Sequence, residues 1–164
     1  MKKPIKNRAD SARAQLARMA AAEGRAFDSI LLLYFQERLL ARLVASPHRD
    51  RFVLKGALLF LALSEGAAER LRSRPTKDID FLGRKLPADL TAVGDVFREV
   101  VAIILDDGVV FDPNTVHAAR IRENADYQGV RVHVVARLGQ ARARLQIDIG
   151  FGDVVTPKML KEHP

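Results

Sequence analysis

Helical spacing of apolar residues predicts that the first part of the chain is α-helical. Residues 7–23 are rich in Ala and Arg, which favour helices, and Gly24 is a suitable end. Residues 27–45 are apolar nearly all round at "ILLLYF", become amphipathic later, and end at Ser46-Pro47. A further helix is predicted over residues 57–66. After residue 89 an apolar stripe predicts one more helix: Leu90, Val93, Phe97, Val100, Val101 and Ile104.

Alternation of apolar and polar residues predicts that the remaining segments are strands. A short strand is expected over residues 51–56 and another around Asp78-Ile79-Asp80. Four more are expected at residues 108–113, 115–121, 129–139 and 141–153. Because helices lead and a mostly antiparallel or mixed sheet follows, the predicted fold class is α+β. We expect a helical segment over 1–50 and a core over 51–164, together forming one domain.

The segment "RPTKDIDFLG" carries two aspartates that point the same way. Side chains alternate between the faces of a strand, so Asp78 and Asp80 share one face while Ile79 and Phe81 share the other. Carboxylates with Cα atoms about 6.6 Å apart disfavour each other's ionised form unless a cation or a hydrogen-bonding group compensates. The pair is therefore a candidate metal site, and a pair that simply faces water is the alternative.

Asp148 is a third acid on the polar face of a predicted strand. In "RLQIDIG", Ile147 and Ile149 point to the core side and Asp148 points the other way. If this strand lies beside the Asp-Ile-Asp strand, three carboxylates converge on one surface. Oxygen ligands on a rigid sheet suit Mg²⁺, which prefers carboxylates and substrate phosphates. Such ions can activate an attacking hydroxyl and stabilise a leaving pyrophosphate.

The segment "VLKGA" is a candidate phosphate-binding turn. Lys55 and Gly56 come at the end of a predicted strand and before a predicted helix, where backbone amides and the helix dipole favour an anion. An ordinary turn that needs glycine's conformational freedom is the alternative. By alternation, Arg74 and Thr76 fall on the face of the two aspartates, where they could meet a triphosphate or remain solvated turn residues.

Composition narrows the cellular setting and the class of partner. The chain has no cysteine, and its longest apolar run, residues 57–63, is too short to cross a membrane. We therefore expect a soluble cytoplasmic protein. The net charge of +7 favours a nucleic acid, a nucleotide or an acidic protein as partner. Five side chains are candidates for a basic sheet surface that either binds an RNA backbone or simply keeps an exposed face soluble: Arg131, His133, Arg137, Arg142 and Arg144.

Three motifs occur in the order "FVLKGALLF", "RPTKDIDFLG" and "RLQIDIGFGDVVTP". Together they resemble the AbiEii/AbiGii family of nucleotidyltransferase toxins, within the DNA polymerase beta-like superfamily. The resemblance runs from about residue 51 to residue 157 and implies a nucleotidyltransferase core, a small mixed sheet flanked by helices. It implies that Asp78 and Asp80 bind Mg²⁺ and that Asp148 is the third acid, as a metal ligand or as the base for the acceptor hydroxyl. It also implies that Gly56, with Lys55 beside it, binds nucleotide phosphates.

The reaction implied by this resemblance is transfer of a nucleoside monophosphate from an NTP to a hydroxyl, with release of pyrophosphate. Family acceptors are RNAs such as tRNA, and members are typically toxins of type IV toxin–antitoxin pairs, so a cognate antitoxin is an implied partner. The chain departs from the superfamily at Gly56-Ala57, where a Gly-Ser pair or a second glycine is common.

Family members also usually continue into a helical region that supplies a further lysine and aspartate. This region is expected to be absent, because the sequence ends at Pro164. Two alternatives follow from that expectation and from the charge of the first helices. One is a truncated or degenerate module that binds nucleotide or RNA without catalysis. The other is an interaction protein that docks an antitoxin through Arg13 and Arg18.

Overall fold

Helices come first along the chain and a sheet follows, which confirms the α+β prediction. The computed structural model describes residues 5–55, 77–121 and 129–151. The helices of this part are α1 (Ile5–Glu23), α2 (Phe27–Ala45) and α5 (Leu90–Val101), with short 3₁₀ turns η1 (Arg49–Arg51) and η2 (Pro113–Thr115). The strands are β1 (Phe52–Lys55), β2 (Asp78–Gly83), β3 (Val109–Phe111), β4 (His117–Ile121), β5 (Gly129–Leu138) and β6 (Ala141–Gly150). The helix expected over residues 57–66 lies outside the described residues, as do Gly56, Arg74 and Thr76.

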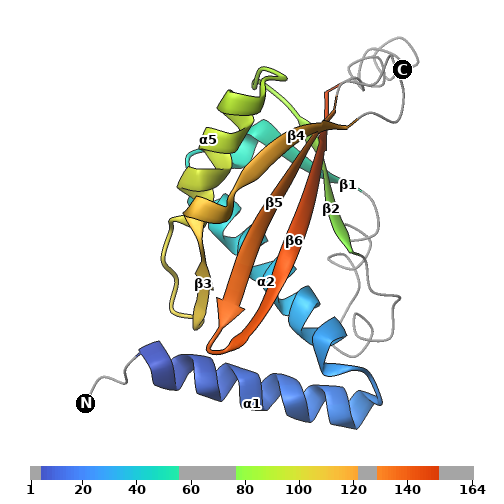
Figure 1. The fold of residues 1–164 in the computed structure, drawn as a ribbon, viewed down its shortest axis with the longest axis vertical. Helices are drawn as coiled ribbons and strands as arrows, with labels where there is room; N and C mark the ends of the chain where they lie inside the picture. Colours follow the sequence, from blue (N-terminus) through green and yellow to red (C-terminus); the bar gives the residue numbers. More distant parts are fainter. Residues whose placement is uncertain (1–4, 56–76, 122–128, 152–164) are drawn as a thin grey trace, which may run out of the picture.

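The six strands form a mixed sheet in the order β1-β2-β6-β5-β3, with β4 also paired to β5 (Figure 1). Neighbouring strands are antiparallel except β2 and β6, which run parallel. Both β3 and β4 lie along the same edge of β5. Between them the Thr115 hydroxyl accepts a hydrogen bond from the Val135 N–H (2.9 Å) and the Asp112 N–H donates to the Val135 carbonyl (3.1 Å). The backbone N–H and carbonyl of Val135 are therefore both hydrogen-bonded between the ends of β3 and β4.

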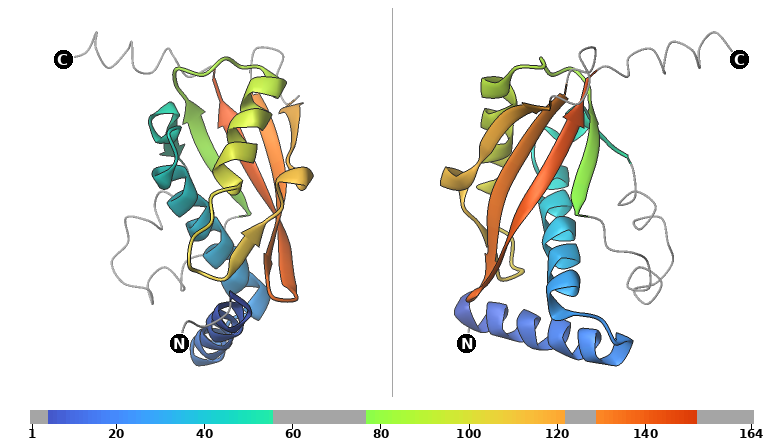
Figure 2. Two further views of the ribbon diagram at one scale, coloured as in Figure 1. Left: turned by 90° about the vertical axis from the view of Figure 1, so that its left-hand side faces the viewer. Right: turned by 45° about the vertical axis from the view of Figure 1, so that its right-hand side comes forward.

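Helices α2 and α5 pack against one face of the sheet, and α1 crosses its end at the β5–β6 turn (Figure 1, Figure 2). The apolar positions of the strands face the helices, as alternation predicted, and Ile79 and Ile147 are fully buried. The ring of Phe52 lies 5.3 Å from those of Phe81 and Phe97, between centroids, which joins β1, β2 and α5. The opposite face of the sheet carries the polar side chains.

Helix α2 carries a charge on its buried face. The side chain of Arg42 is 1% exposed, and its guanidinium donates to both carboxylate oxygens of Asp107, at 2.8 and 3.1 Å. It also donates to the carbonyl oxygens of Ile103 and Val109, each at 3.0 Å. These bonds fasten α2 to the chain that follows α5, and they compensate the burial of the charge. Among the described helices, α2 included, none is long and apolar enough to cross a membrane.

The prediction for Ile104 is wrong. This residue was placed on the buried stripe of a helix, but α5 ends at Val101 and Ile104 is 84% exposed. The Ile103 N–H bonds to the Val100 carbonyl in a tight turn, and the Ile103 carbonyl accepts from Arg42. The chain therefore leaves the helix before Ile104 can reach the core, because the contact with Arg42 sets its direction.

We predict that Gly108→Ala destabilises the fold through its contact with α1. Gly108 has a φ of +78°, and a Cβ there would lie 2.8 Å from the Ala9 Cα and 2.9 Å from the Ala9 backbone nitrogen. The matched control is Gly24→Ala, which has a φ of +64° and open space around the new Cβ. Urea unfolding should show a loss about 1–3 kcal/mol larger at Gly108 than at Gly24, the usual cost of overpacking. Equal losses would show that backbone conformation alone matters.

Candidate active site

The three predicted carboxylates come from two adjacent strands. In the parallel β2–β6 pair, Asp80 is the register partner of Asp148, and Asp78 is the partner of Gln146. Their neighbours along each strand are buried against the helices, so the four polar side chains share the opposite face. Figure 1 looks onto this face, with α2 behind β5 and β6. The pairing of β2 with β6, which the predicted site requires, is therefore present. The roles of the site residues stay a prediction.

Two hydrogen-bonded groups tie Asp148 and Asp78 to the neighbouring strand β5. Arg131 binds Asp148 with two parallel bonds, Nε to Oδ1 at 2.9 Å and Nη2 to Oδ2 at 3.0 Å. Gln146 donates to the Asp78 Oδ1 (2.9 Å), while its own carbonyl oxygen lies 3.0 Å from the His133 Nε2. Asp78 and Asp148 are thus held in a half-buried polar layer across three strands.

Burial and mutual repulsion perturb the two aspartates of β2. Burial raises the pKa of Asp78, and the Asp148 carboxylate raises it further, against the opposing charge of Arg131. Burial likewise raises the pKa of Asp80, with added repulsion from Asp148 and Asp78, which Lys55 and Arg131 offset only in part. A cation at this surface would relieve that repulsion.

The donor set fits a hard divalent cation in its chemistry, because it consists of carboxylate oxygens on rigid strands. In the present arrangement, however, the described residues contain no group of three or more His, Cys, Asp or Glu side chains that could hold a metal ion. In this arrangement each oxygen of Asp148 accepts a hydrogen bond from the Arg131 guanidinium.

Lys55 is the one candidate phosphate-binding residue that falls within the described residues. It ends β1, and its register partner across the β1–β2 ladder is Asp80. Its positive charge lowers the pKa of Asp80, so the ammonium group lies close enough to act on that carboxylate. A cation beside the acids suits a triphosphate that approaches the same surface.

The predicted basic surface divides into two parts. Arg131 and His133 belong to the polar layer of the site, whereas the three remaining arginines are exposed towards the β5–β6 turn. Of these, Arg137 and Arg142 are direct cross-strand partners, and Arg144 lies two residues along β6. Like charges placed opposite each other on a sheet repel, and a polyanion would relieve this repulsion.

The contact between Arg131 and Asp148 is the part of the site that the sequence analysis missed. The sequence of the turn between β5 and β6 does indicate this contact. A tight turn at Gly139-Gln140 pairs Leu138 with Ala141, and counting outward from this pair brings Arg131 opposite Asp148. The positive φ of Gly139, +63°, is what such a turn requires.

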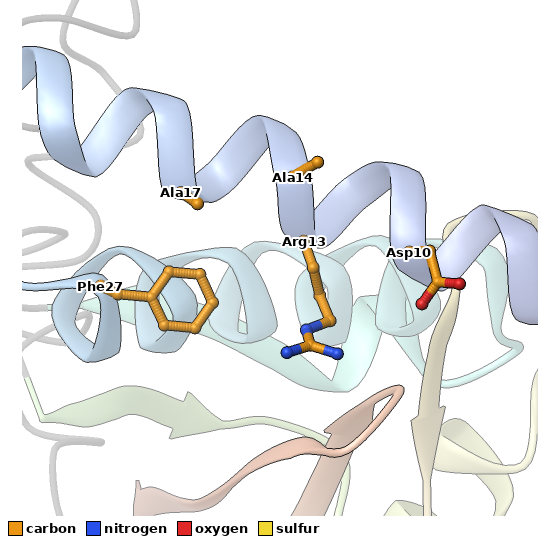
Figure 3. A pocket seen from close by; sticks show the side chains of 5 residues that line it. All are labelled: Asp10, Arg13, Ala14, Ala17 and Phe27. Carbon is orange, nitrogen blue, oxygen red and sulfur yellow. The ribbon is translucent and has the colours of Figure 1, made fainter.

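A separate pocket of about 430 Å³ lies between α1 and the start of α2 (Figure 3). Arg13 extends from α1 into it, and the Arg13 Nε is buried with no hydrogen-bond partner among the described residues. This side chain lies beside Gly139 in the β5–β6 turn, at the opposite end of β6 from Asp148. No predicted metal or phosphate ligand lines the pocket, which is formed by Asp10, Arg13, Ala14, Ala17 and Phe27.

Acid-bearing strands lie side by side in this α+β fold. Nucleotidyltransferases belong to the class of proteins with this arrangement. The family described as "Nucleotidyl transferase AbiEii toxin, Type IV TA system" matches residues 38–164, and the chain belongs to this family. The resemblance carried by the three motifs is thereby confirmed. No curated protein matches the chain.

Two solved structures from Helicobacter pylori are similar to this chain. JHP933 has a TM-score of 0.44 and 17% identity, over 79% of this chain and 46% of its own. The second, provisionally described as a nucleotidyltransferase, has a TM-score of 0.44 and 19% identity, over 75% of this chain and 45% of its own. This chain therefore spans less than half the length of either protein.

Because the pKa of Asp80 is raised, its ionised carboxylate opposes folding. The folded protein binds this proton more tightly than the unfolded chain does, so stability falls as the pH rises from the ordinary aspartate pKa through the raised value. We predict that Asp80→Asn raises the melting temperature at pH 7 in metal-free buffer, and that the gain disappears at pH 3. Thermal melts in EDTA at both pH values measure this. An unchanged melting temperature at pH 7 would contradict the raised pKa.

Proposed function

We propose that this chain is the core of a Mg²⁺-dependent nucleotidyltransferase, which moves a nucleoside monophosphate from an NTP to a hydroxyl of an RNA such as tRNA. The observation that carries the proposal is the parallel pairing of β2 with β6, with Asp80 opposite Asp148 and Asp78 on the same polar face. Membership of the AbiEii family supports the reaction class.

In the proposed reaction the acceptor oxygen forms a bond to the α-phosphorus, and the bond from that phosphorus to its bridging oxygen breaks. Pyrophosphate leaves, and the acceptor proton goes to a base. Asp78 and Asp80 hold Mg²⁺, and Asp148 serves as the third acid, either as a ligand or as that base. When bound, the cation supplies positive charge to the triphosphate and to the leaving group.

The phosphate contacts in this proposal come from Lys55 and from Gly56, Arg74 and Thr76. Lys55 lies on β1 and is the register partner of Asp80 on β2. An ammonium group next to the carboxylates orients an anionic substrate towards them and offsets part of its charge. Asp78 and Asp80 would hold the cation and Lys55 is the register partner of Asp80, so both positive charges would be available to one triphosphate.

The biological role that we propose is that of a cytoplasmic toxin of a type IV toxin–antitoxin pair. Family membership supports this role, and the excess of positive charge supports an RNA acceptor. A cognate antitoxin is then a partner, and the pocket beside Arg13 on α1 is a candidate contact for an acidic segment of it.

The proposed function is tested by label transfer. The purified chain is incubated with total tRNA and each α-labelled NTP in turn, with Mg²⁺ or with EDTA. We expect label in RNA with one or more NTPs and only with Mg²⁺, together with release of pyrophosphate. Label that moves equally well in EDTA would contradict the metal-dependent reaction. Tight, salt-sensitive tRNA binding without any transfer would instead indicate a binding module.

Charge reversal on the exposed arginines should weaken RNA binding. We predict that Arg142→Glu lowers the affinity for tRNA and reduces the slope of log K against log salt by about 1, the effect of losing one phosphate contact. The matched control is Arg98→Glu, an exposed arginine of α5 on the helix side of the molecule. Filter binding at several salt concentrations separates the two variants. Equal losses would place the RNA elsewhere.

A further inference from the structure

Arg131 lies within the carboxylate layer and donates a hydrogen bond to each oxygen of Asp148. It is the direct cross-strand partner of Asp148 in the β5–β6 hairpin, and its two parallel hydrogen bonds take one carboxylate oxygen each. Such a fork-to-fork pair is among the strongest side-chain contacts in proteins. As long as it persists, a cation has to compete with the guanidinium for the oxygens of Asp148.

The guanidinium also acts on the other two acids. Its charge lowers the pKa values of Asp78 and Asp80, against the burial and repulsion that raise them. Three carboxylates thus share the field of one guanidinium, which holds a position where a cation would relieve the same repulsion. Arg131 therefore compensates, in part, the charge that a bound metal would compensate.

The side chains of Arg131 and Asp148 differ in exposure, and this difference permits the arginine to exchange the acid for another partner. The side chain of Arg131 is 33% exposed, whereas that of Asp148 is 15% exposed. The arginine therefore has a path towards solvent and an incoming substrate, while the acid stays in the layer between β2 and β5. A triphosphate offers arginine the same planar, two-bonded contact that a carboxylate does.

We propose that Arg131 is a positioning residue that gates the metal site. It holds Asp148 when neither metal nor nucleotide is bound, and it releases Asp148 to the cation when a phosphate of the nucleotide takes its place. The proposal rests on the metal-binding role proposed above for Asp78 and Asp80, and of the two roles given to Asp148 it takes that of the third metal ligand. No covalent step is involved, because one ion pair is exchanged for a carboxylate–metal contact and an arginine–phosphate contact.

The test measures Mn²⁺ affinity by electron paramagnetic resonance, without nucleotide, for the wild type, Arg131→Gln, Asp148→Asn and the double variant. Removing the arginine's charge favours a cation in either background, but only the chain that keeps Asp148 can gain a ligand. We expect Arg131→Gln to tighten Mn²⁺ binding about tenfold more when Asp148 is present than in the Asp148→Asn background, a coupling of ordinary size. Equal factors in the two backgrounds would overturn the gate.

A second arm uses inorganic triphosphate, the part common to every NTP. With it, the loss of Mn²⁺ affinity caused by Asp148→Asn should grow about tenfold in the wild type and stay unchanged in the Arg131→Gln background. A loss that does not grow would overturn the phosphate exchange. Arg131→Lys keeps the charge but not the fork, so it should release Asp148 in part, and it replaces Arg131→Gln if that variant melts below the assay temperature.

These readouts separate the gate from the reaction. Mn²⁺ binding requires no transfer, so a chain that transfers no label can still show the coupling between Arg131 and Asp148. Conversely, an active chain without that coupling would retain the proposed function and lose the gate. If Arg131 were purely structural, Arg131→Gln would lower the melting temperature and change Mn²⁺ affinity by the same factor with and without Asp148.

Discussion

Asp80→Asn should reduce nucleotidyl transfer about 10³-fold or more while the fold remains intact. The expectation follows from the proposed role of Asp80 as a metal ligand, since loss of a charge that stabilises the transition state typically removes several kcal/mol of catalysis. The substitution keeps the shape of the side chain and removes its charge, so packing around Ile79 and Phe81 is preserved. Initial rates of label transfer at saturating NTP provide the measurement.

The control for this variant is Asp95→Asn, the same chemical change on exposed α5, where Asp95 pairs only with Arg98 among the described residues. That variant should transfer label at the wild-type rate. Asp80→Asn should also be the more stable of the two at pH 7, because the pKa of Asp80 is raised. A large loss of activity with a gain in stability identifies a functional carboxylate. Retained activity would remove Asp80 from the mechanism.

Asp107→Ala should cost about 3–5 kcal/mol of stability, because it leaves a buried arginine without its counter-ion. Arg42 is almost fully buried, and Asp107 accepts two of its hydrogen bonds and one from Arg38 at 2.7 Å. Burial alone would raise the pKa of Asp107, but the bonds from Arg42 and Arg38 outweigh it and hold the pKa below its usual range. Urea unfolding at pH 7 measures the loss.

The neighbouring residue provides the control. Asp106 pairs with Arg8 at 3.0 Å, but both side chains are largely exposed, so Asp106→Ala should cost less than about 1 kcal/mol. The stability that Asp107 contributes is present above the ordinary aspartate pKa and is lost as the pH falls through the lowered value. The gap between the two variants should therefore narrow in acid. Similar losses at pH 7 would mean that Arg42 finds other partners.

Local patterns predicted which residues face the core and which face the site. Alternation placed Ile79 and Ile147 against the helices and Asp78, Asp80 and Asp148 on the other face, as the structure has them. This succeeds because the direction of a side chain in a strand depends only on parity. The position of the buried stripe on α5 followed in the same way as far as Val101.

Contacts between distant segments could not be predicted in the same way. The order of strands, and above all the parallel contact of β2 with β6, depends on the packing of the whole sheet rather than on either segment. Ile104 leaves the core because Arg42, more than 60 residues earlier, binds the carbonyl before it. An arginine in a largely apolar helix gives no indication of such a partner, so both the burial of Arg42 and the end of α5 were missed.

The parallel contact of β2 with β6 also bears on when the site comes into being. The β5–β6 hairpin can form locally within microseconds, but Asp78 meets Gln146 across a separation of 68 residues, so this contact requires a large loop to close. On the ribosome, Asp78 and Asp80 are synthesised about 3–14 s before the last strand of the pair. A partly made chain thus carries the Asp-Ile-Asp segment without the third acid, and the carboxylate surface cannot assemble before β6 has been synthesised.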